Sequence, residues 1–135
     1  MGGVEVKIAA IGDNVIDRYL NKGVMYPGGN AVNVAAHASM LGAQAAYIGE
    51  IGNDLGGRII TDALSSLNVD LSQSCMPEKA TTKTCDVNVY NGERVEVGYD
   101  TGACWAHKTH INDSDVKFLQ GFDAVFTSVK CKAAG

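Results

Sequence analysis

Residues 27–52 read PGGNAVNVAAHASMLGAQAAYIGEIG and contain, in order, a turn, a helix and a strand. The Pro-Gly-Gly-Asn run breaks the chain, and the good helix formers of residues 31–41 follow it and end at Gly42. One face of this helix carries the apolar residues Ala31, Val34, Ala35, Ala38 and Leu41. Because this stripe is narrow and rich in alanine, we expect the helix to lie close against a sheet. The apolar run of residues 43–51 predicts the next buried strand.

The segments on either side continue this alternation of strand and helix. Upstream, residues 6–11 predict a buried strand that ends at the polar Asp13 and Asn14. Downstream, Asp54 is the expected N-cap of a helix over residues 55–67. The order strand, helix, strand, helix is typical of an α/β fold with a doubly wound sheet.

The pattern changes at residues 84–90, which alternate between apolar and polar side chains. Asn91-Gly92 predicts a type I′ hairpin turn, and the return strand has Val95, Val97 and Tyr99 at alternate positions, which places them on one face. Residues 20–26 predict a further, edge strand. A hairpin with one polar face favours a flap over a cleft, and an ordinary edge hairpin remains the alternative.

The last part of the sequence predicts one more helix and strand. A short helix is expected from Asn112-Asp113 to about Gly121, followed by a buried strand over residues 123–129. The sequence stops six residues later, and no helix covers that strand. We interpret this ending as that of a truncated α/β protein.

Composition limits the class of protein. The 135 residues are 46% hydrophobic and 19% charged, which suits one compact domain and excludes a disordered segment. No apolar run approaches the roughly 20 residues of a membrane span, and the first residues lack the pattern of a secretory signal. Fifteen Asp and Glu against eleven Lys and Arg argue against a nucleic acid or a membrane surface as partner. We therefore expect a cytoplasmic protein.

Cysteine and histidine give no metal site in this sequence. The four cysteines contain no CxxC pair and are interpreted as small buried or half-buried apolar residues: Cys75, Cys85, Cys104 and Cys131. His107 and His110, near Asp113 and Asp115, are interpreted as part of a solvated loop, because a metal site needs more ligands in a fixed geometry. We expect no bound metal at these residues.

Two groups of polar residues are candidates for binding a polyol. Asp13 and Asp17 follow the first strand, and their carboxylates can accept hydrogen bonds from sugar hydroxyls. The second group lies at the start of the first helix, where backbone N–H groups are free: Gly28, Gly29, Asn30 and Asn33. A simple turn with helix caps is the alternative. No Walker loop or GxGxxG run is present.

Glu93-Arg94, beside the hairpin turn, allows two interpretations. One is a solvated pair of opposite charges. The other is a charge on the flap that contacts a ligand.

The run GGNAVNVA at residues 28–35, with Gly42 and Gly52 at fixed distances after it, resembles the amino-terminal signature of the ribokinase-like (PfkB) carbohydrate kinases. Further similar features are GDNVID after the first strand, GNDLGG before the second helix, NGER in the hairpin and Thr101-Gly102-Ala103 after it. The resemblance covers essentially the whole chain. Within the family, GDNVID and GGNAVNVA look most like the fructosamine kinases, which phosphorylate fructoselysine.

This resemblance implies a ribokinase-like three-layer α/β sandwich, present here as its amino-terminal part over residues 1–135, with a small β lid. The lid strands correspond to residues near 20–26 and 82–99. The implied reaction transfers a phosphoryl group from ATP, with Mg²⁺, to a sugar hydroxyl. The implied sugar ligands are Asp13, Asp17, Gly28, Gly29, Asn30 and Asn33, with Arg94 and Tyr99 reaching in from the lid. Exposed lid strands also suggest a homodimer.

One part of the family pattern is missing. Residues 1–135 contain no DTxGAGD run, which in the family supplies the catalytic Asp and an anion hole. A positioned general base contributes roughly 10²–10⁴-fold, and stabilisation of the transferring phosphoryl group usually contributes more. We therefore expect this chain alone to be inactive, with ATP and Mg²⁺ bound mainly by other residues. The alternatives are a non-catalytic module for sugar binding or association through the lid, and another α/β enzyme in which the GGN turn is only structural.

Overall fold

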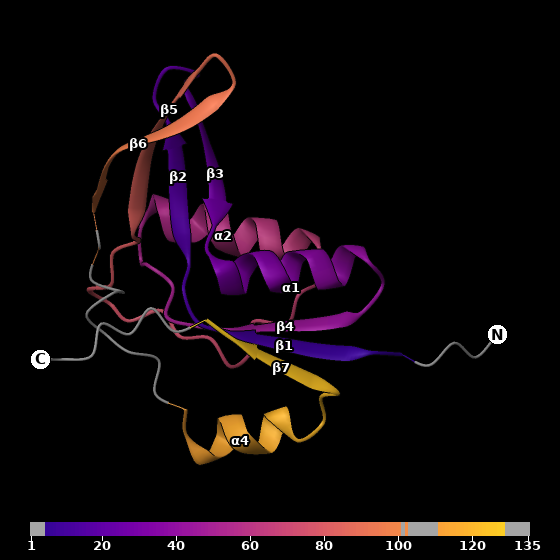
Figure 1. Ribbon diagram of the computed structural model, residues 1–135. Helices are drawn as coiled ribbons and strands as arrows, with labels where there is room; N and C mark the ends of the chain where they lie inside the picture. Colours follow the sequence, from indigo (N-terminus) through magenta and orange to yellow (C-terminus); the bar gives the residue numbers. More distant parts are fainter. Residues whose placement is uncertain (1–4, 101, 103–110, 129–135) are drawn as a thin grey trace, which may run out of the picture.

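The computed structural model describes residues 5–100, 102 and 111–128, and its elements form two sheets with helices around one of them (Figure 1). The interpretations of Cys104, His107, His110 and Cys131 concern residues outside the described part of the chain. The strands are β1 (Lys7–Ile11), β2 (Val15–Tyr19), β3 (Val24–Gly28), β4 (Gln44–Ile48), β5 (Thr84–Tyr90), β6 (Glu93–Asp100) and β7 (Ala124–Thr127). The helices are α1 (Asn30–Met40), α2 (Leu55–Ser66) and α4 (Asp113–Leu119).

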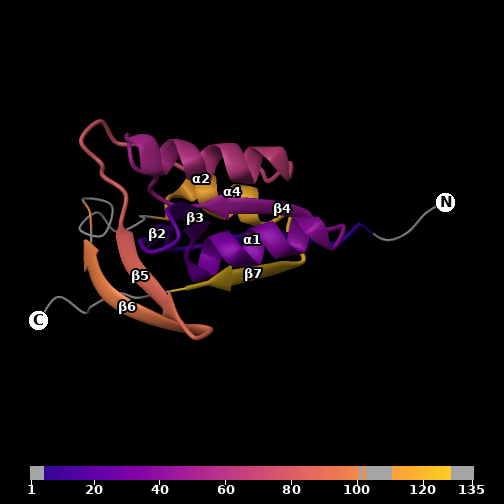
Figure 2. The same ribbon diagram turned by 90° about the horizontal axis from the view of Figure 1, so that it is seen from above.

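The central sheet is parallel and has the order β4-β1-β7. α1 packs on β1 and β4, α2 lies on the same side, and α4 lies on the opposite face (Figures 1 and 2). Helices on both faces of a parallel sheet make the three layers of an α/β sandwich. The main core lies between the sheet and α1 and α2, where Tyr47, Ile60 and Leu64 are almost completely buried.

The helices follow the local signals of the sequence closely. α1 and α2 begin and end within one residue of the predicted ranges. Asp54 is the N-cap of α2, as predicted, and its Oδ1 accepts a hydrogen bond from the Gly57 N–H at 2.9 Å. Leu41 was expected on the buried stripe of α1, and this was wrong: it is the C-cap, beyond the last turn, and is 88% exposed.

Two further expectations about burial were wrong. β7 was expected to be a buried strand, but all four of its residues are exposed; it lies at one edge of the central sheet. Cys75 was expected to be buried or half-buried and is exposed, whereas Cys85 is buried as expected. Both of these thiols are free.

A second sheet, which we call the lid, rises from the carboxyl ends of the central strands (Figure 1). Its order is β3-β2-β5-β6, with β2 and β5 parallel and the other pairs antiparallel. β2 was not predicted as a strand. The strand expected over residues 20–26 is displaced to Val24–Gly28, because residues 20–23 form the turn between β2 and β3.

The hairpin β5–β6 has the predicted turn and an unpredicted bulge. Asn91 and Gly92 have positive φ values of 51° and 81°, as a type I′ turn requires. The register shifts at Asp86/Val87, so that Val97 has no partner on β5. The expectation that Val95, Val97 and Tyr99 share one face was therefore wrong, because Val95 lies opposite Asn88 and Tyr99 lies opposite Cys85.

Among the helices of the described residues, none is both long enough and apolar enough to cross a lipid bilayer.

Candidate functional site

The site is built where the central sheet meets the lid. After β1 the chain passes through Gly12 into β2, and β3 returns it to α1. Val15 pairs with Gly28 at the base of these two strands. A Cβ on Gly29, whose φ is +104°, would lie 2.7 Å from the carbonyl oxygen of Asp13. Only glycine allows this close approach, so the Gly-Gly turn brings the start of α1 against the segment that follows β1.

Asp17 projects from β2 beside this turn. Its side chain is 23% exposed, and a Cβ on Gly28 would lie 2.9 Å from its Oδ2. The absence of a side chain at Gly28 therefore lets the Asp17 carboxylate pack closely against the backbone of the turn. Burial raises the pKa of Asp17 above the ordinary value of 3.8, the nearby Arg94 guanidinium partly opposes this rise, and the charge of Glu96 adds to it.

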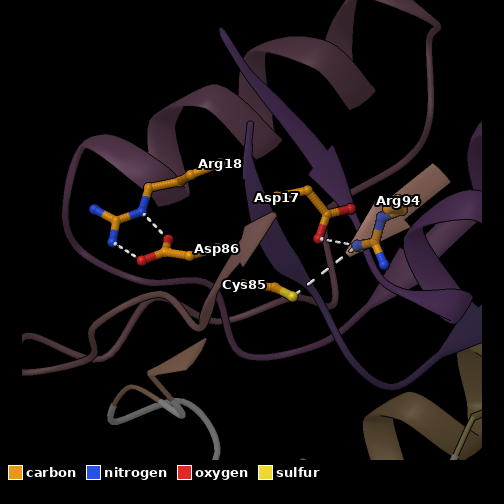
Figure 3. A network of polar contacts seen from close by, with 5 residues as sticks. All are labelled: Asp17, Arg18, Cys85, Asp86 and Arg94. Atoms are coloured by element: carbon orange, nitrogen blue, oxygen red, sulfur yellow. Dashed lines mark hydrogen bonds and ion pairs between the residues drawn. The ribbon is translucent and has the colours of Figure 1, made fainter. Parts of the chain in front are cut away.

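Arg94 reaches Asp17 from the far edge of the lid. Its Nη2 lies 3.4 Å from Asp17 Oδ1 and 4.0 Å from the Sγ of the buried Cys85 (Figure 3). The hydrogen bond between Arg94 and Tyr19 raises the pKa of Arg94, against the effect of burial and together with the charge of Asp17. Of the two interpretations of Glu93-Arg94, the geometry favours the charge that faces the candidate site.

The two faces of the lid carry separate ion pairs. Consecutive residues of a strand point to opposite faces, so Arg18 lies on the other side of β2 from Asp17. There it forms a bidentate pair with Asp86, with distances of 2.6 and 2.8 Å (Figure 3). We call the two surfaces the Asp17 face and the Arg18 face. Their independence provides matched controls for the experiments below.

Asp13 has a different environment from Asp17. Its carboxylate accepts hydrogen bonds from the backbone N–H groups of Asn30 and Ala31, at 3.3 and 3.4 Å, and from the hydroxyl of Ser128. A carboxylate at the N-terminus of a helix satisfies free N–H donors and interacts favourably with the helix dipole. The structure thus places Asp13 as a support for the Gly28–Asn30 turn.

The remaining predicted residues lie around this centre. Gly28 is buried next to Asp17, while Asn30 and Asn33 are exposed on the first turn of α1. Tyr99 lies opposite Cys85, which in turn pairs with Asp17, so all three share one row of the lid. Tyr99 is 65% exposed. The structure therefore brings Asp17, Gly28 and Arg94 together, with Tyr99 in the same row and Asn33 further along α1.

Asn14 was not singled out from the sequence, although it follows the same strand as Asp13. It is 6% exposed, and its Nδ2 donates to the Tyr47 hydroxyl at 2.9 Å and to the Glu50 carbonyl at 2.8 Å. Its Oδ1 is buried and accepts no hydrogen bond from the described residues. A buried amide oxygen without a donor is costly, and the two hydrogen bonds that Nδ2 donates hold this side chain just after β1. Its position directly after Asp13 was the available signal.

Comparisons with known proteins identify the family of this chain. The chain matches the pfkB family of carbohydrate kinases over residues 5–132. This chain belongs to the pfkB family. It is 34% identical to the fructosamine kinase FrlD of Bacillus subtilis over 128 residues, which cover 92% of this chain and 44% of that protein. It is 30% identical to the fructoselysine 6-kinase of Escherichia coli over 122 residues, which cover 90% and 46%.

Solved structures of the family share the fold. A sugar kinase of Pyrococcus horikoshii, solved in complex with ATP, is 31% identical with a TM-score of 0.63, covering 72% of this chain and 35% of its own. The ribokinase of Arabidopsis thaliana has a TM-score of 0.79 at 20% identity, covering 92% and 45%, and so supports the ribokinase-like fold. The chain spans about half the length of the curated relatives FrlD and fructoselysine 6-kinase. The resemblance inferred from the GGNAVNVA run is confirmed.

No site for the ATP and Mg²⁺ that the family implies is assigned among the described residues. Among residues 5–100, 102 and 111–128, no group of three or more His, Cys, Asp or Glu side chains is arranged to hold a metal ion. A cavity of about 650 Å³ is lined by Lys7, Gln44 and Phe118, at the opposite end of the central strands from Asp17. We therefore derive no step of phosphoryl transfer from these residues.

Proposed function

We propose that this protein takes part in the ATP-dependent phosphorylation of a sugar hydroxyl, and that its substrate is a fructosamine such as fructoselysine. The observation that carries the proposal is the half-buried Asp17 carboxylate, which lies against Gly28 of the Gly-Gly turn and within 3.4 Å of Arg94 of the lid. The names of the relatives FrlD and fructoselysine 6-kinase support the substrate class.

In this proposal residues 1–135 bind and orient the sugar. Asp17 accepts hydrogen bonds from sugar hydroxyls, and hydrogen bonds to a charged group contribute about 1.5–3 kcal/mol each. Gly28 and Gly29 let the sugar approach the backbone, while Asn30 and Asn33 offer amide groups from the first turn of α1. Asp13 contributes by holding that turn in place.

The lid has the second role in this proposal. Arg94 and Tyr99 lie on the Asp17 face, where they would cover a bound sugar and limit its contact with water. When Arg94 moves from Asp17 to the ligand, the carboxylate becomes free for the sugar hydroxyls. The pair is partly exposed and monodentate, so replacing it costs little.

Phosphoryl transfer itself is not assigned to residues 1–135. They contain no DTxGAGD run, and the described part of the chain offers no metal-binding cluster. We propose that ATP and Mg²⁺ are bound mainly by other residues, and that this chain alone is inactive. Since the two described thiols are free, we also propose that the protein acts in the reducing cytoplasm.

The test is phosphoryl transfer from ATP to fructoselysine, fructose and ribose, measured with the protein as its gene encodes it. The proposal expects fructoselysine to be the preferred substrate. Binding of the three sugars to residues 1–135 alone is measured by titration calorimetry. Failure of all three sugars to bind would overturn both the proposed sugar-binding role of residues 1–135 and the proposed substrate class.

A second candidate is a non-catalytic module that binds sugar or associates through its lid. The observation that favours association is β6, an edge strand whose Val95, Val97 and Tyr99 are 40%, 50% and 65% exposed. Edge strands with exposed apolar side chains readily pair with another chain. Light scattering after size exclusion measures this directly: a homodimer that Val97→Lys converts to a monomer supports it, and a monomer at all concentrations contradicts it.

A further inference from the structure

Glu96 lies on the same face of the lid as Asp17. Asp17 pairs with Cys85 and Tyr19 pairs with Val87, so the side chains of β2 and β5 form two adjacent rows. On β6, the row of Val87 continues with Glu96. Because of the bulge after Glu96, Glu96 stays opposite Val87 while Tyr99 stays opposite Cys85 in the adjacent row. Bulges re-aim side chains in this way next to binding sites.

The Glu96 carboxylate has no protein partner in the part of the chain that the structure describes. The ion pairs there join Arg18 to Asp86 and Arg94 to Asp17. No hydrogen bond among the described residues ends at the Glu96 side chain, which is exposed. The carboxylate is therefore free to bind a ligand.

The charge of Glu96 nevertheless reaches the candidate sugar site. It acts to raise the pKa of Asp17, where burial is the larger cause, and it acts in the same direction on the pKa of Cys85. Two cations act on this site: Arg94, which contacts Asp17, and Lys83, whose charge also acts to lower the pKa of Asp17. Neither ion pair of the described residues includes Glu96, so its carboxylate is a negative charge near the sugar site without a direct contact to a cation among them.

A fructosamine differs from fructose by a charge that suits this arrangement. Fructose has a neutral hydroxyl on its first carbon, whereas a fructosamine has an aliphatic amine there. Aliphatic amines such as that of Lys are protonated at neutral pH. A protonated amine attracts a carboxylate as an ion pair and also donates hydrogen bonds to it, whereas the neutral hydroxyl of fructose can donate a hydrogen bond but forms no ion pair, and an ether oxygen does neither.

We propose that Glu96 binds the protonated amine of a fructosamine while Asp17 binds its sugar hydroxyls, so that Glu96 determines the preference for a fructosamine over an unmodified ketohexose. This inference rests on the proposed sugar-binding function. It adds a specificity-determining residue to the site around Asp17, and it gives the lid a role in choosing the substrate as well as in covering it.

The test compares two ligands that differ in one atom, 1-butylamino-1-deoxyfructose and 1-O-butylfructose, by titration calorimetry with the protein as its gene encodes it. Glu96→Gln should weaken binding of the amine by roughly tenfold and change binding of the ether by less than about twofold. The matched control is Glu93→Gln, which removes the same charge from the same strand but on the Arg18 face, where Glu93 lies opposite Tyr90. It should leave both affinities unchanged.

Each outcome decides between the inference and the function on which it rests. Equal weakening of both ligands in Glu96→Gln would show a structural effect and overturn the inference. An unchanged ratio of amine to ether affinity would also overturn it, while binding of both ligands to the unaltered protein would leave the sugar-binding function standing. Failure of the unaltered protein to bind either ligand would overturn both. Thermal unfolding of each variant checks that the lid remains folded.

Discussion

Arg94 Nη2 lies 3.4 Å from Asp17 Oδ1 although 77 residues separate them in the sequence. The contact joins β6, at one edge of the lid, to β2 in its interior. It places the guanidinium over the carboxylate that the family resemblance assigns to the sugar. The pair is partly exposed, so it holds the lid in place weakly and can exchange for hydrogen bonds to a ligand.

Each ion pair of the lid should influence the ionisation of its own carboxylate and leave the other carboxylate unchanged. The charge of Arg94 acts to lower the pKa of Asp17, and the hydrogen bond from Arg18 lowers the pKa of Asp86. Arg94→Gln should therefore raise the pKa of Asp17 alone, and Arg18→Gln should raise the pKa of Asp86 alone. Carboxyl carbon NMR titration measures both values in each variant. A change of both carboxylates in either variant would contradict the separation of the two faces.

The pH dependence of stability should carry the signature of Asp17. Burial raises the pKa of Asp17 above 3.8, against the opposing charge of Arg94, so the folded protein binds this proton more tightly than the unfolded chain. The contribution of Asp17 to the free energy of unfolding is therefore greatest below pH 3.8 and declines as the pH rises through the raised pKa. Asp17→Asn should remove this decline. Urea unfolding of the unaltered protein and of Asp17→Asn, across the pH range of this decline, measures the effect. Parallel curves of unfolding free energy against pH would contradict the role given to Asp17.

Glycine substitutions should separate the backbone conformation of the turn at Gly29 from the close contact between Gly28 and Asp17. A Cβ on Gly29 would lie 2.7 Å from the Asp13 carbonyl oxygen, and its φ of +104° strains any other residue, so Gly29→Ala should destabilise the protein by more than about 2 kcal/mol. Gly42→Ala, at φ +96° with nothing within 4 Å, measures strain alone and should cost about 1–2 kcal/mol.

Gly28→Ala should affect the ligand more than the fold. The added Cβ would lie 2.9 Å from the mobile end of the Asp17 side chain, so the carboxylate must shift. Sugar affinity should fall while the free energy of unfolding changes by less than about 1 kcal/mol. Chemical unfolding and sugar titration check both halves. A large loss of stability without loss of affinity would contradict the position given to Asp17.

Asp13 should behave as a support for α1. It accepts hydrogen bonds from the N–H groups of Asn30 and Ala31, and a carboxylate that caps a helix in this way contributes about 1 kcal/mol. Asp13→Ala should lower the free energy of unfolding by about that amount, whereas the exposed Asp62→Ala in α2 should change it by less than about 0.5 kcal/mol. Equal effects of the two changes would contradict the capping role.

Local signals in the sequence predicted the helices and turns well. The Asp54 cap, the limits of α1 and α2 and the Asn91-Gly92 turn depend on neighbouring residues, which the sequence displays directly. β2 was missed because its residues, Val15–Tyr19, alternate poorly and form a strand only by pairing with β3 and β5. Such pairing depends on residues far apart in the chain, which no local pattern shows.

The candidate site was predictable in its parts and not in its assembly. Asp17 and Gly28 were identified from the sequence, and Arg94 was left between two interpretations. The contact between Arg94 and Asp17, and the bulge that puts Glu96 in the row of Val87, arise from the register of the lid. Register is set by packing across strands, so the structure was needed to show which charges share a face.

The most direct test of the sugar site is the affinity of fructoselysine for Asp17→Asn, measured by titration calorimetry beside Asp86→Asn. Both variants neutralise one carboxylate of a lid ion pair, on the Asp17 face and the Arg18 face respectively. We predict that Asp17→Asn weakens binding by about tenfold or more, because it removes charge-assisted hydrogen bonds to the sugar, while Asp86→Asn changes it by less than about twofold. Binding by Asp17→Asn equal to that of the unaltered protein would contradict the site.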